Sequence, residues 1–449
     1  MSIVVSSSQL TPFRDVFRML KMLKKGELLY QKTTLDNGLR VITATIPHTR
    51  SMSICIFVGV GSRYETDDKA GVSHFIEHIM FRGTHRRQTA REISEAIEGV
   101  GGILNGGTDR EATVYWCKVA QPHFSIALDV LTDMLLYSRL EPQDMEKERQ
   151  VIIEEINMSY DSPSQRVGML IDGLLWPDHP LGRDIAGSKQ SVASITRDAL
   201  LYYLKCQYLP ENTVVSIAGN IKHQEAVAAV RKYIGDWTVH EQRSGYTAYS
   251  GKIKERLSVE TRDIEQAHLC LALPGLSLFH PQRFTFDLLN VILGEGMSSR
   301  LFCEIRDRLG LAYSINSFVE HLSDTGSVVI YAGVEPKNLK VAIKVILEQL
   351  SLLKETMVPE VELSKAKELA KGRLLLRMED SRNVAGWMGG QETLTGRILS
   401  VDQVITIIDA ITADEIRKLA QKMMLASRLR LAVVGPVSKD EALGGLLKL

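Results

Sequence analysis

The sequence predicts an α+β protein built from two homologous domains, each an antiparallel-rich sheet covered by helices. Two observations carry this prediction. The chain has 449 residues, which is too long for one ordinary hydrophobic core. The order strand, loop, two helices, strand and two helices also occurs twice, displaced by about 215 residues. A repeat of this size indicates the duplication of a domain.

The composition is that of a soluble globular protein, with 45% apolar and 24% charged residues. Lysine plus arginine equals aspartate plus glutamate at 54 each, and aromatic residues make up only 6%, so we expect no nucleic-acid partner. The chain has no apolar run long enough for a transmembrane segment. Five widely spaced cysteines indicate free thiols in a reducing compartment, so we predict the cytoplasm, with the mitochondrial matrix as the alternative.

Residues 1–29 are predicted to form an amphipathic helical extension. Thr11 and Pro12 are typical of a helix start, and Gly26 is a plausible stop. Apolar and basic side chains alternate at helical spacing between them. Such a helix could pack on the body of the protein, touch a membrane surface, dock a partner or act as a transit peptide.

The first domain is expected at residues 30–240. An Asp-Asn-Gly turn predicts a hairpin, a glycine-rich loop precedes the first helix, and Pro122 and Pro142 each open a later helix. The predicted elements are a hairpin at 33–42, strands at 51–58 and 111–119, and helices at 71–80, 90–100, 122–136 and 142–160.

The second domain is expected at residues 256–449, after a polar stretch that begins near His240. The predicted strands are 266–273, 312–318 and 326–334, and the predicted helices are 283–293, 299–309, 336–353 and 359–377. The helix at 283–293 corresponds to the one at 71–80 but contains no histidine. Any histidine-dependent chemistry therefore belongs to the first domain alone.

The helix at 71–80 carries the candidate chemistry, in the run His-Phe-Ile-Glu-His at 74–78. Positions i and i+4 of a helix share a face, so His74 and His78 can bind one cation. Glu77 projects near the same cation and can accept a proton from water. A catalytic zinc needs three protein ligands and one open position, so one ligand is missing. The alternative is a helix with two partly exposed histidines, one of them paired to Glu77.

The missing ligand is expected from the helix at 142–160. Glu148 and Glu155 lie seven residues apart and share a face, flanked by isoleucines that would pack that face inward. Glu154 is rotated away by about 100° and is expected in solvent. The spacing alone leaves Glu148 and Glu155 as candidates.

Several ordered segments resemble the pitrilysin-type (inverzincin, M16-like) zinc peptidases, among them the short two-domain bacterial members and the mitochondrial processing peptidase beta subunit. The matching segments are 71–84, 101–108 with Glu111, 148–155 and 301–313, and the resemblance spans about 30–435. It implies a processing-peptidase-like metallohydrolase fold.

The resemblance also implies roles for individual residues. Zn²⁺ would be bound by His74, His78 and Glu155, with Glu77 as the general base and Glu148 supporting the site. Asn105, Gly106 and Gly107 would lie on an edge strand that binds substrate. Arg306 and Tyr313 would form a substrate-binding and catalytic pair in the second domain. For Arg306 the alternative is a surface charge, and for Tyr313 it is a core tyrosine.

Family members of this length pair to close a four-domain chamber, with the Arg–Tyr pair supplied by the partner chain. Because this chain carries both sets of residues, we expect a homodimer, with a heterodimer as the alternative. The expected function is that of a zinc-dependent endopeptidase acting on peptides or small unfolded segments inside this chamber. The alternatives are a leader-peptide processing peptidase of one biosynthetic pathway and a non-catalytic subunit of a larger complex.

Overall fold

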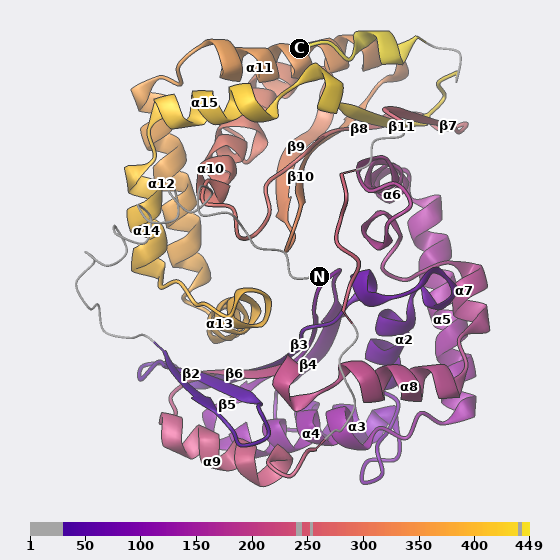
Figure 1. Cartoon of the computed structure of the whole chain (residues 1–449), viewed down its shortest axis with the longest axis vertical. Coiled ribbons are helices and arrows are strands. Elements are labelled where there is room, and N and C mark those ends of the chain that lie inside the picture. Colours follow the sequence, from indigo (N-terminus) through magenta and orange to yellow (C-terminus); the bar gives the residue numbers. More distant parts are fainter. Residues whose placement is uncertain (1–29, 239–244, 252–254, 439–441) are drawn as a thin grey trace, which may run out of the picture. The chain divides into compact units, whose positions relative to one another are not determined.

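The computed structural model describes residues 30–238, 245–251, 255–438 and 442–449 (Figure 1). The predicted helix between Thr11 and Gly26 lies outside the described residues, as does part of the predicted domain boundary. The chain groups into two compact units. The N-terminal unit contains residues 30–251 and Leu376–Ile398, and the C-terminal unit contains Glu255–Leu375 and Leu399–Leu449.

The N-terminal unit is built on a six-stranded sheet with the order β1-β2-β6-β3-β5-β4. Its strands are β1 (Gln31–Thr34), β2 (Arg40–Thr45), β3 (Ser51–Val58), β4 (Ile103–Thr108), β5 (Thr113–Ala120) and β6 (Thr213–Gly219). The pair β2–β6 is parallel and the other four pairs are antiparallel. Strand β4 lies at one edge, which matters for the site described below.

Helices cover one face of this sheet and share its larger hydrophobic core. They are α2 (Val72–Ile79), α3 (Ala90–Glu98), α4 (Phe124–Tyr137), α5 (Pro142–Asp161), α7 (Lys189–Ser194), α8 (Arg197–Gln207) and α9 (His223–Ile234). Helix α6 (Pro163–Leu175) packs against α5. Alternation along β3 sends Ile54 and Ile56 into this core, against Phe75 of α2 among others. Helix α2 is therefore held directly by the sheet and its covering helices.

The opposite face of the same sheet is covered by α13 (Ser381–Thr395), which is far away in the sequence. Phe57 of β3 packs against α13 in a separate core. Glu392 of α13 is only 2% exposed and pairs with Lys32 at 2.6 Å and with Arg40 at 3.3 Å. A segment from the second half of the sequence thus completes the N-terminal unit, although it lies within the range 256–449 that was expected to form the second domain.

The C-terminal unit repeats the sheet topology. Its strands are β7 (Leu257–Thr261), β8 (Ala267–Pro274), β9 (Ala312–His321), β10 (Gly326–Val334) and β11 (Arg430–Gly435), in the order β7-β11-β8-β10-β9. This order reproduces β2-β6-β3-β5-β4, and the β7–β11 pair is parallel as the β2–β6 pair is. The predicted α+β fold with a duplicated domain is therefore confirmed.

The helices of the C-terminal unit are α10 (Arg283–Gly294), α11 (Leu339–Glu355), α12 (Glu360–Arg377), α14 (Val401–Ala410) and α15 (Ala413–Met423). The predicted helix at 299–309 contains a π-helix at Phe302–Arg308. Short 3₁₀ helices occupy Ser62–Tyr64, Asp67–Lys69, Gln121–His123, Pro180–Gly182, Pro210–Asn212, Pro336–Asn338, Ala426–Arg428 and Leu443–Leu446.

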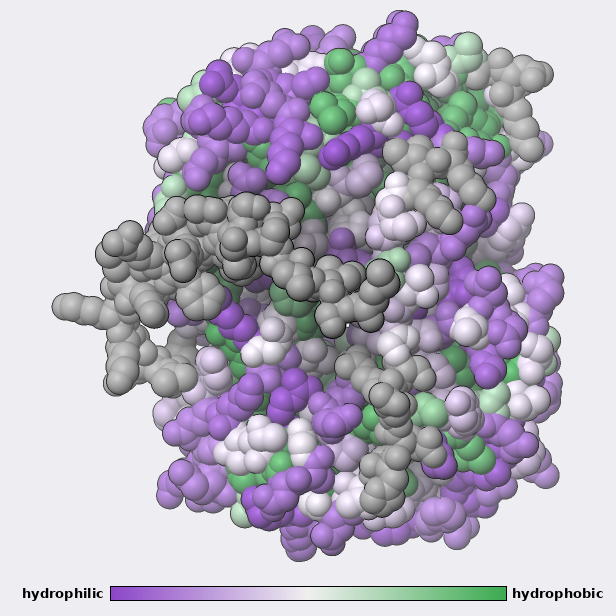
Figure 2. All heavy atoms as spheres, viewed as in Figure 1, coloured by the Kyte–Doolittle hydropathy of each residue, from purple (hydrophilic) through white to green (hydrophobic). Residues whose placement is uncertain are grey.

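All five cysteines are free, and four of them are buried. This agrees with the predicted absence of a disulfide framework. Within the described residues, none of the helices has the length and apolarity that a membrane crossing requires. The face of the molecule shown in Figure 2 is largely hydrophilic, with small patches of hydrophobic residues among the hydrophilic ones.

Candidate metal centre

Helix α2 turns one apolar face inward and one polar face outward. Its apolar side chains at helical spacing are buried: Val72, Phe75, Ile76 and Ile79. The helix begins after Gly71, whose φ of +92° is left-handed and favours glycine. A Cβ at Gly71 would also lie 2.4 Å from the Ala186 carbonyl oxygen. The partly exposed polar face carries His74, Glu77 and His78.

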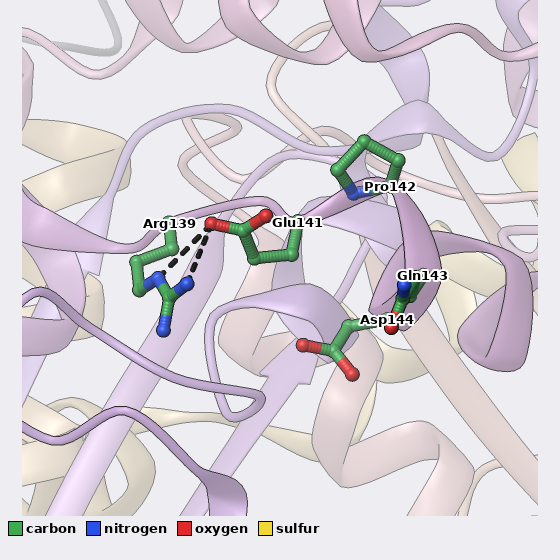
Figure 3. A pocket seen from close by; sticks show the side chains of 5 residues that line it. All are labelled: Arg139, Glu141, Pro142, Gln143 and Asp144. Atoms are coloured by element: carbon green, nitrogen blue, oxygen red, sulfur yellow. Dashed lines mark hydrogen bonds and ion pairs between the residues drawn. The ribbon is translucent and has the colours of Figure 1, made fainter.

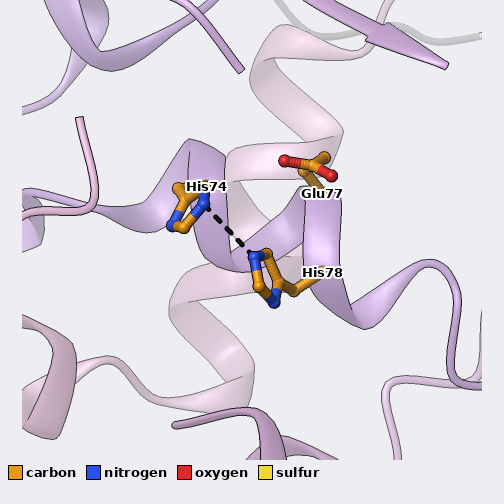
Figure 4. Close-up of side chains that lie close together, drawn as sticks. All are labelled: His74, Glu77 and His78. Atoms are coloured by element: carbon orange, nitrogen blue, oxygen red, sulfur yellow. Dashed lines mark hydrogen bonds between the residues drawn. The ribbon is translucent and has the colours of Figure 1, made fainter. Parts of the chain in front are cut away.

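The two histidines of α2 point toward one another (Figure 4). Their Nε2 atoms are 3.2 Å apart. One ligand atom each from His74, Glu77 and His78 lies within 4.8 Å of the others. The predicted pairing of the histidines on one helical face is therefore present in the structure.

Glu155 of α5 approaches the same two nitrogens. Its Oε2 lies 3.8 Å from Nε2 of His74 and 3.5 Å from Nε2 of His78. Zinc bonds to nitrogen and oxygen are about 2.0–2.1 Å long, so ligand atoms of a tetrahedral site lie about 3.3 Å apart. The three atoms have nearly this spacing, and together they fit a three-ligand zinc site.

Glu148 lies about two helical turns before Glu155 on α5. It contacts the other side of the His78 ring. It is 2% exposed, and its Oε2 lies 3.0 Å from Nδ1 of His78. Its second carboxylate oxygen pairs with Arg82, which follows α2. A carboxylate on Nδ1 directs Nε2 toward a metal and fixes the ring orientation. Glu148 therefore fits a supporting role and Glu155 fits a ligand role.

The local environment shifts two pKa values in the directions that metal chemistry needs. Burial lowers the pKa of His74 to about 4, and the neighbouring His78 adds to the shift. His74 is thus neutral at pH 7, which is the form that binds metals. Burial raises the pKa of Glu77, Glu155 adds to the increase, and His78 and Thr108 oppose it. A raised pKa makes Glu77 a stronger proton acceptor than an exposed glutamate.

Strand β4 presents an open edge beside Glu77. The amide of Asp109 donates to the carbonyl of Ala112 at 2.9 Å, which sets the alternation of the β4–β5 ladder. The backbone groups of Leu104, Gly106 and Thr108 therefore face away from β5, toward the free edge. Asn105 is exposed, and its side-chain oxygen accepts a hydrogen bond from the Gly106 amide at 2.7 Å.

Gly106 and Gly107 have different surroundings. A Cβ at Gly106 would lie 2.8 Å from Oε1 of Glu77 and 3.1 Å from the Phe81 ring. A Cβ at Gly107 would meet nothing closer than Val114, at 3.9 Å. Thr108 donates from its hydroxyl to Oε2 of Glu77 at 3.4 Å. The absence of a side chain at Gly106 thus lets the edge strand pass directly over the Glu77 carboxylate.

Arg306 and Tyr313 come together within the C-terminal unit. The guanidinium carbon of Arg306, in the π-helix, lies 4.9 Å from the centre of the Tyr313 ring. Tyr313 is 80% exposed, so the alternative of a core tyrosine is wrong. Arg306 is also exposed. The structure therefore presents the pair on the surface of its unit.

A shallow hollow lies elsewhere on the N-terminal unit, at the start of α5 (Figure 3). It is lined by Arg139, Glu141, Pro142, Gln143 and Asp144. Arg139 and Glu141 are already paired with each other at 2.8 Å. None of the candidate metal-centre residues is among those that line this hollow.

Sequence reasoning missed three neighbours of the metal centre. Arg82 lies four residues after His78, so helical spacing could have indicated it. Thr108 lies on the predicted strand, but its contact with Glu77 depends on how the strand passes the helix. Glu65 accepts hydrogen bonds from backbone amides at the start of α2, and no residue spacing in the sequence indicates this contact.

Two family models match consecutive parts of the chain. The chain matches Insulinase (Peptidase family M16) over residues 40–189 and the Peptidase M16 inactive domain over residues 194–369. The second match covers the region in which α10 has no histidine.

Relatives that match nearly the whole chain are named zinc proteases. An uncharacterized zinc protease of Mycobacterium leprae is 37% identical over 423 residues, covering 93% of this chain and 94% of the relative. The uncharacterized zinc protease YmxG of Bacillus subtilis is 34% identical over 408 residues, covering 91% and 98%. The crystal structure of a protease from Helicobacter pylori superimposes with a TM-score of 0.85 at 22% identity, covering 90% of this chain and 99% of that one.

Proposed function

This chain belongs to peptidase family M16, and we propose that it is a zinc-dependent endopeptidase that hydrolyses peptides or small unfolded segments. One observation carries the proposal. The atoms of His74, His78 and Glu155 that would bind zinc are separated by 3.2 to 3.8 Å, close to the edge lengths of a tetrahedral zinc site. Its relatives are named zinc proteases, which supports the same assignment.

His74, His78 and Glu155 would hold the metal, and Glu148 would orient His78. When bound, zinc supplies a Lewis acid that acidifies water and polarises a peptide carbonyl. Glu77 accepts a proton from the attacking water through its carboxylate. It then passes this proton to the leaving amine. Thr108 holds one oxygen of that carboxylate, so Glu77 stays aimed at the open edge of β4.

The open edge of β4 would bind the substrate backbone. The outward-facing groups of Leu104, Gly106 and Thr108 can pair with an extended peptide by β-addition. Asn105 adds a side-chain contact once it releases the Gly106 amide. Backbone pairing accepts many sequences, so selectivity would come from the chamber and a few side-chain pockets.

Arg306 and Tyr313 would complete the substrate side of the site. Tyr313 would donate to the developing oxyanion, and Arg306 would bind a substrate carbonyl or carboxylate. We propose that the pair comes from the partner chain of a homodimer. The free cysteines are compatible with the proposed cytoplasmic location.

Mixing two inactive variants tests the proposed dimer. Glu77→Gln and Arg306→Ala should each have little activity alone. After random exchange of chains, half of the dimers are mixed and each has one intact site, so about a quarter of the native activity should return. Activity that does not return after mixing, or full activity in an isolated monomer, would contradict a site shared between chains.

Metal removal tests the enzymatic assignment itself. The purified protein should contain about one zinc per chain and cleave members of a mixed peptide pool. A chelator should abolish cleavage, and added zinc should restore it, because the free site retains His74, His78 and Glu155. A chain that binds no zinc would instead favour the non-catalytic subunit. Cleavage confined to one precursor in the pool would favour leader-peptide processing.

A further inference from the structure

Glu65 is a buried carboxylate outside the reaction scheme above. It follows the 3₁₀ helix Ser62–Tyr64 and is 5% exposed. Its two oxygens accept two backbone hydrogen bonds at the start of α2. Oε2 accepts from the amide of Gly71 at 2.7 Å, and Oε1 accepts from the amide of Ser73 at 2.8 Å.

This contact supplies what the sequence of α2 lacks. A helix start leaves four amides without helical partners, and a Ser, Thr, Asp or Asn side chain usually satisfies one of them. The residue before α2 is Gly71, which has no side chain, and the first turn contains no acidic residue. Glu65 therefore caps the helix from the loop directly before it, and in its ionised form its negative charge also suits the positive end of the helix dipole.

Both partners of this contact are themselves held in place. The Ser73 hydroxyl lies 2.8 Å from the hydroxyl of Tyr203. Arg183 donates to the backbone carbonyl of Glu65 at 2.7 Å. His74 is the next residue after Ser73. The hydrogen bonds that Glu65 accepts at the start of α2 therefore help to fix the position of the His74 imidazole along the helix.

Burial raises the pKa of Glu65 to about 7. The two backbone amides, the Ser73 hydroxyl and Arg183 oppose the shift but do not cancel it. Burying a carboxyl group to this degree destabilises the folded protein unless the group forms hydrogen bonds. A small polar residue at the position directly before the helix would be enough to stabilise the helix start alone.

We propose that Glu65 is a positioning residue of the metal centre, which sets the place of His74 by fixing the first turn of α2. It acts through the backbone and would touch neither metal nor substrate. This inference rests on the proposed zinc site. The competing explanation is a purely structural role, in which Glu65 stabilises the fold without affecting the geometry at the metal.

The test compares Glu65→Gln with Glu392→Gln. Glutamine has nearly the same size as glutamate, but its side chain offers one acceptor oxygen and one amide NH2 donor. At position 65, one of the two backbone amides would therefore face another donor. Glu392 is an equally buried carboxylate of the same unit, on α13, paired with Lys32 and Arg40. Both substitutions should lower the melting temperature, and both proteins would be examined where they are folded.

Only Glu65→Gln should change the metal centre. Its zinc affinity, measured in competition with a chromophoric chelator, should fall about 10- to 100-fold, as is common when a residue supporting a ligand is altered. Its cobalt(II) form should show shifted visible absorption bands, whereas Glu392→Gln should match the native spectrum. Glu65→Asp keeps the charge and both oxygens, and should recover part of the affinity. It also serves as the test variant if Glu65→Gln does not fold.

The outcomes separate this inference from the proposed function. Native zinc affinity and a native cobalt spectrum in Glu65→Gln, or equal changes in Glu392→Gln, would overturn the positioning role while leaving the zinc peptidase intact. An unmodified protein that binds neither zinc nor cobalt would overturn the proposed function, and the inference with it.

Discussion

Replacing Glu77 by glutamine should reduce kcat/KM for peptide hydrolysis by about 10²- to 10⁴-fold while leaving zinc bound. The glutamine amide cannot accept a proton from water at neutral pH. It has nearly the same size, so it still fits below Gly106, where Oε1 of Glu77 lies 2.8 Å from the position of an added Cβ. The geometry given by His74, His78 and Glu155 does not require Glu77 as a ligand.

Zinc content and peptide cleavage should be measured on the same preparation. Glu95→Gln is a suitable control, because Glu95 is an exposed carboxylate of α3 that pairs with Arg91 in the same helix. This control should retain native activity. A Glu77→Gln protein that binds zinc and cleaves as fast as the native chain would rule out Glu77 as the general base. Loss of zinc from this variant would instead make Glu77 a ligand.

Local periodicity explains why the core of the candidate site could be predicted. The histidines sit four residues apart on α2, and Glu148 and Glu155 sit seven apart on α5, so each set shares one face of its own helix. The apolar residues between them define the buried face of each helix. The structure brings the two polar faces together, with Glu155 within 3.8 Å of both histidines.

Contacts between distant segments were beyond such reasoning. Helix α13 completes the N-terminal unit through Glu392 and its two basic partners, which lie more than 350 residues earlier in the chain. Its own sequence has no feature that assigns it to one sheet or the other. Glu65 binds the amides of Gly71 and Ser73, and backbone donors carry no side-chain signature. The close passage of Gly106 over Glu77 likewise depends on how a strand crosses a helix.

The two units share a topology, but within the described residues the candidate metal-binding group lies in the N-terminal unit. The five strands β2-β6-β3-β5-β4 of the first sheet are matched in order by the second sheet, so α2 and α10 hold corresponding places in the chain. Helix α10 contains no histidine, and its Asn290 is buried and accepts a hydrogen bond from the Ser317 hydroxyl of β9. A fold can thus be conserved between two copies while one copy keeps the reactive side chains and the other does not.

Replacing Glu155 by glutamine should weaken zinc binding by more than about 100-fold, beyond the 10- to 100-fold typical of a residue that only supports a ligand. The neutral amide oxygen lacks the charge that balances the cation. The same change at Glu154 should have no effect, because Glu154 is exposed and lies about 100° around the helix from Glu155. At Glu148 the expected loss is about 10- to 100-fold, since Glu148 contacts Nδ1 of His78, the nitrogen that faces away from the metal position.

These three substitutions each remove one negative charge from α5, so their ranking separates coordination from a general electrostatic effect. Zinc affinity would be measured by chelator competition at one pH, and activity would be measured at saturating zinc. The assignment requires the largest loss at Glu155, a smaller one at Glu148 and none at Glu154. A greater loss at Glu148 than at Glu155 would exchange the two roles. Equal losses at Glu154 and Glu155 would mean that α5 attracts the cation by its charge without supplying the third ligand.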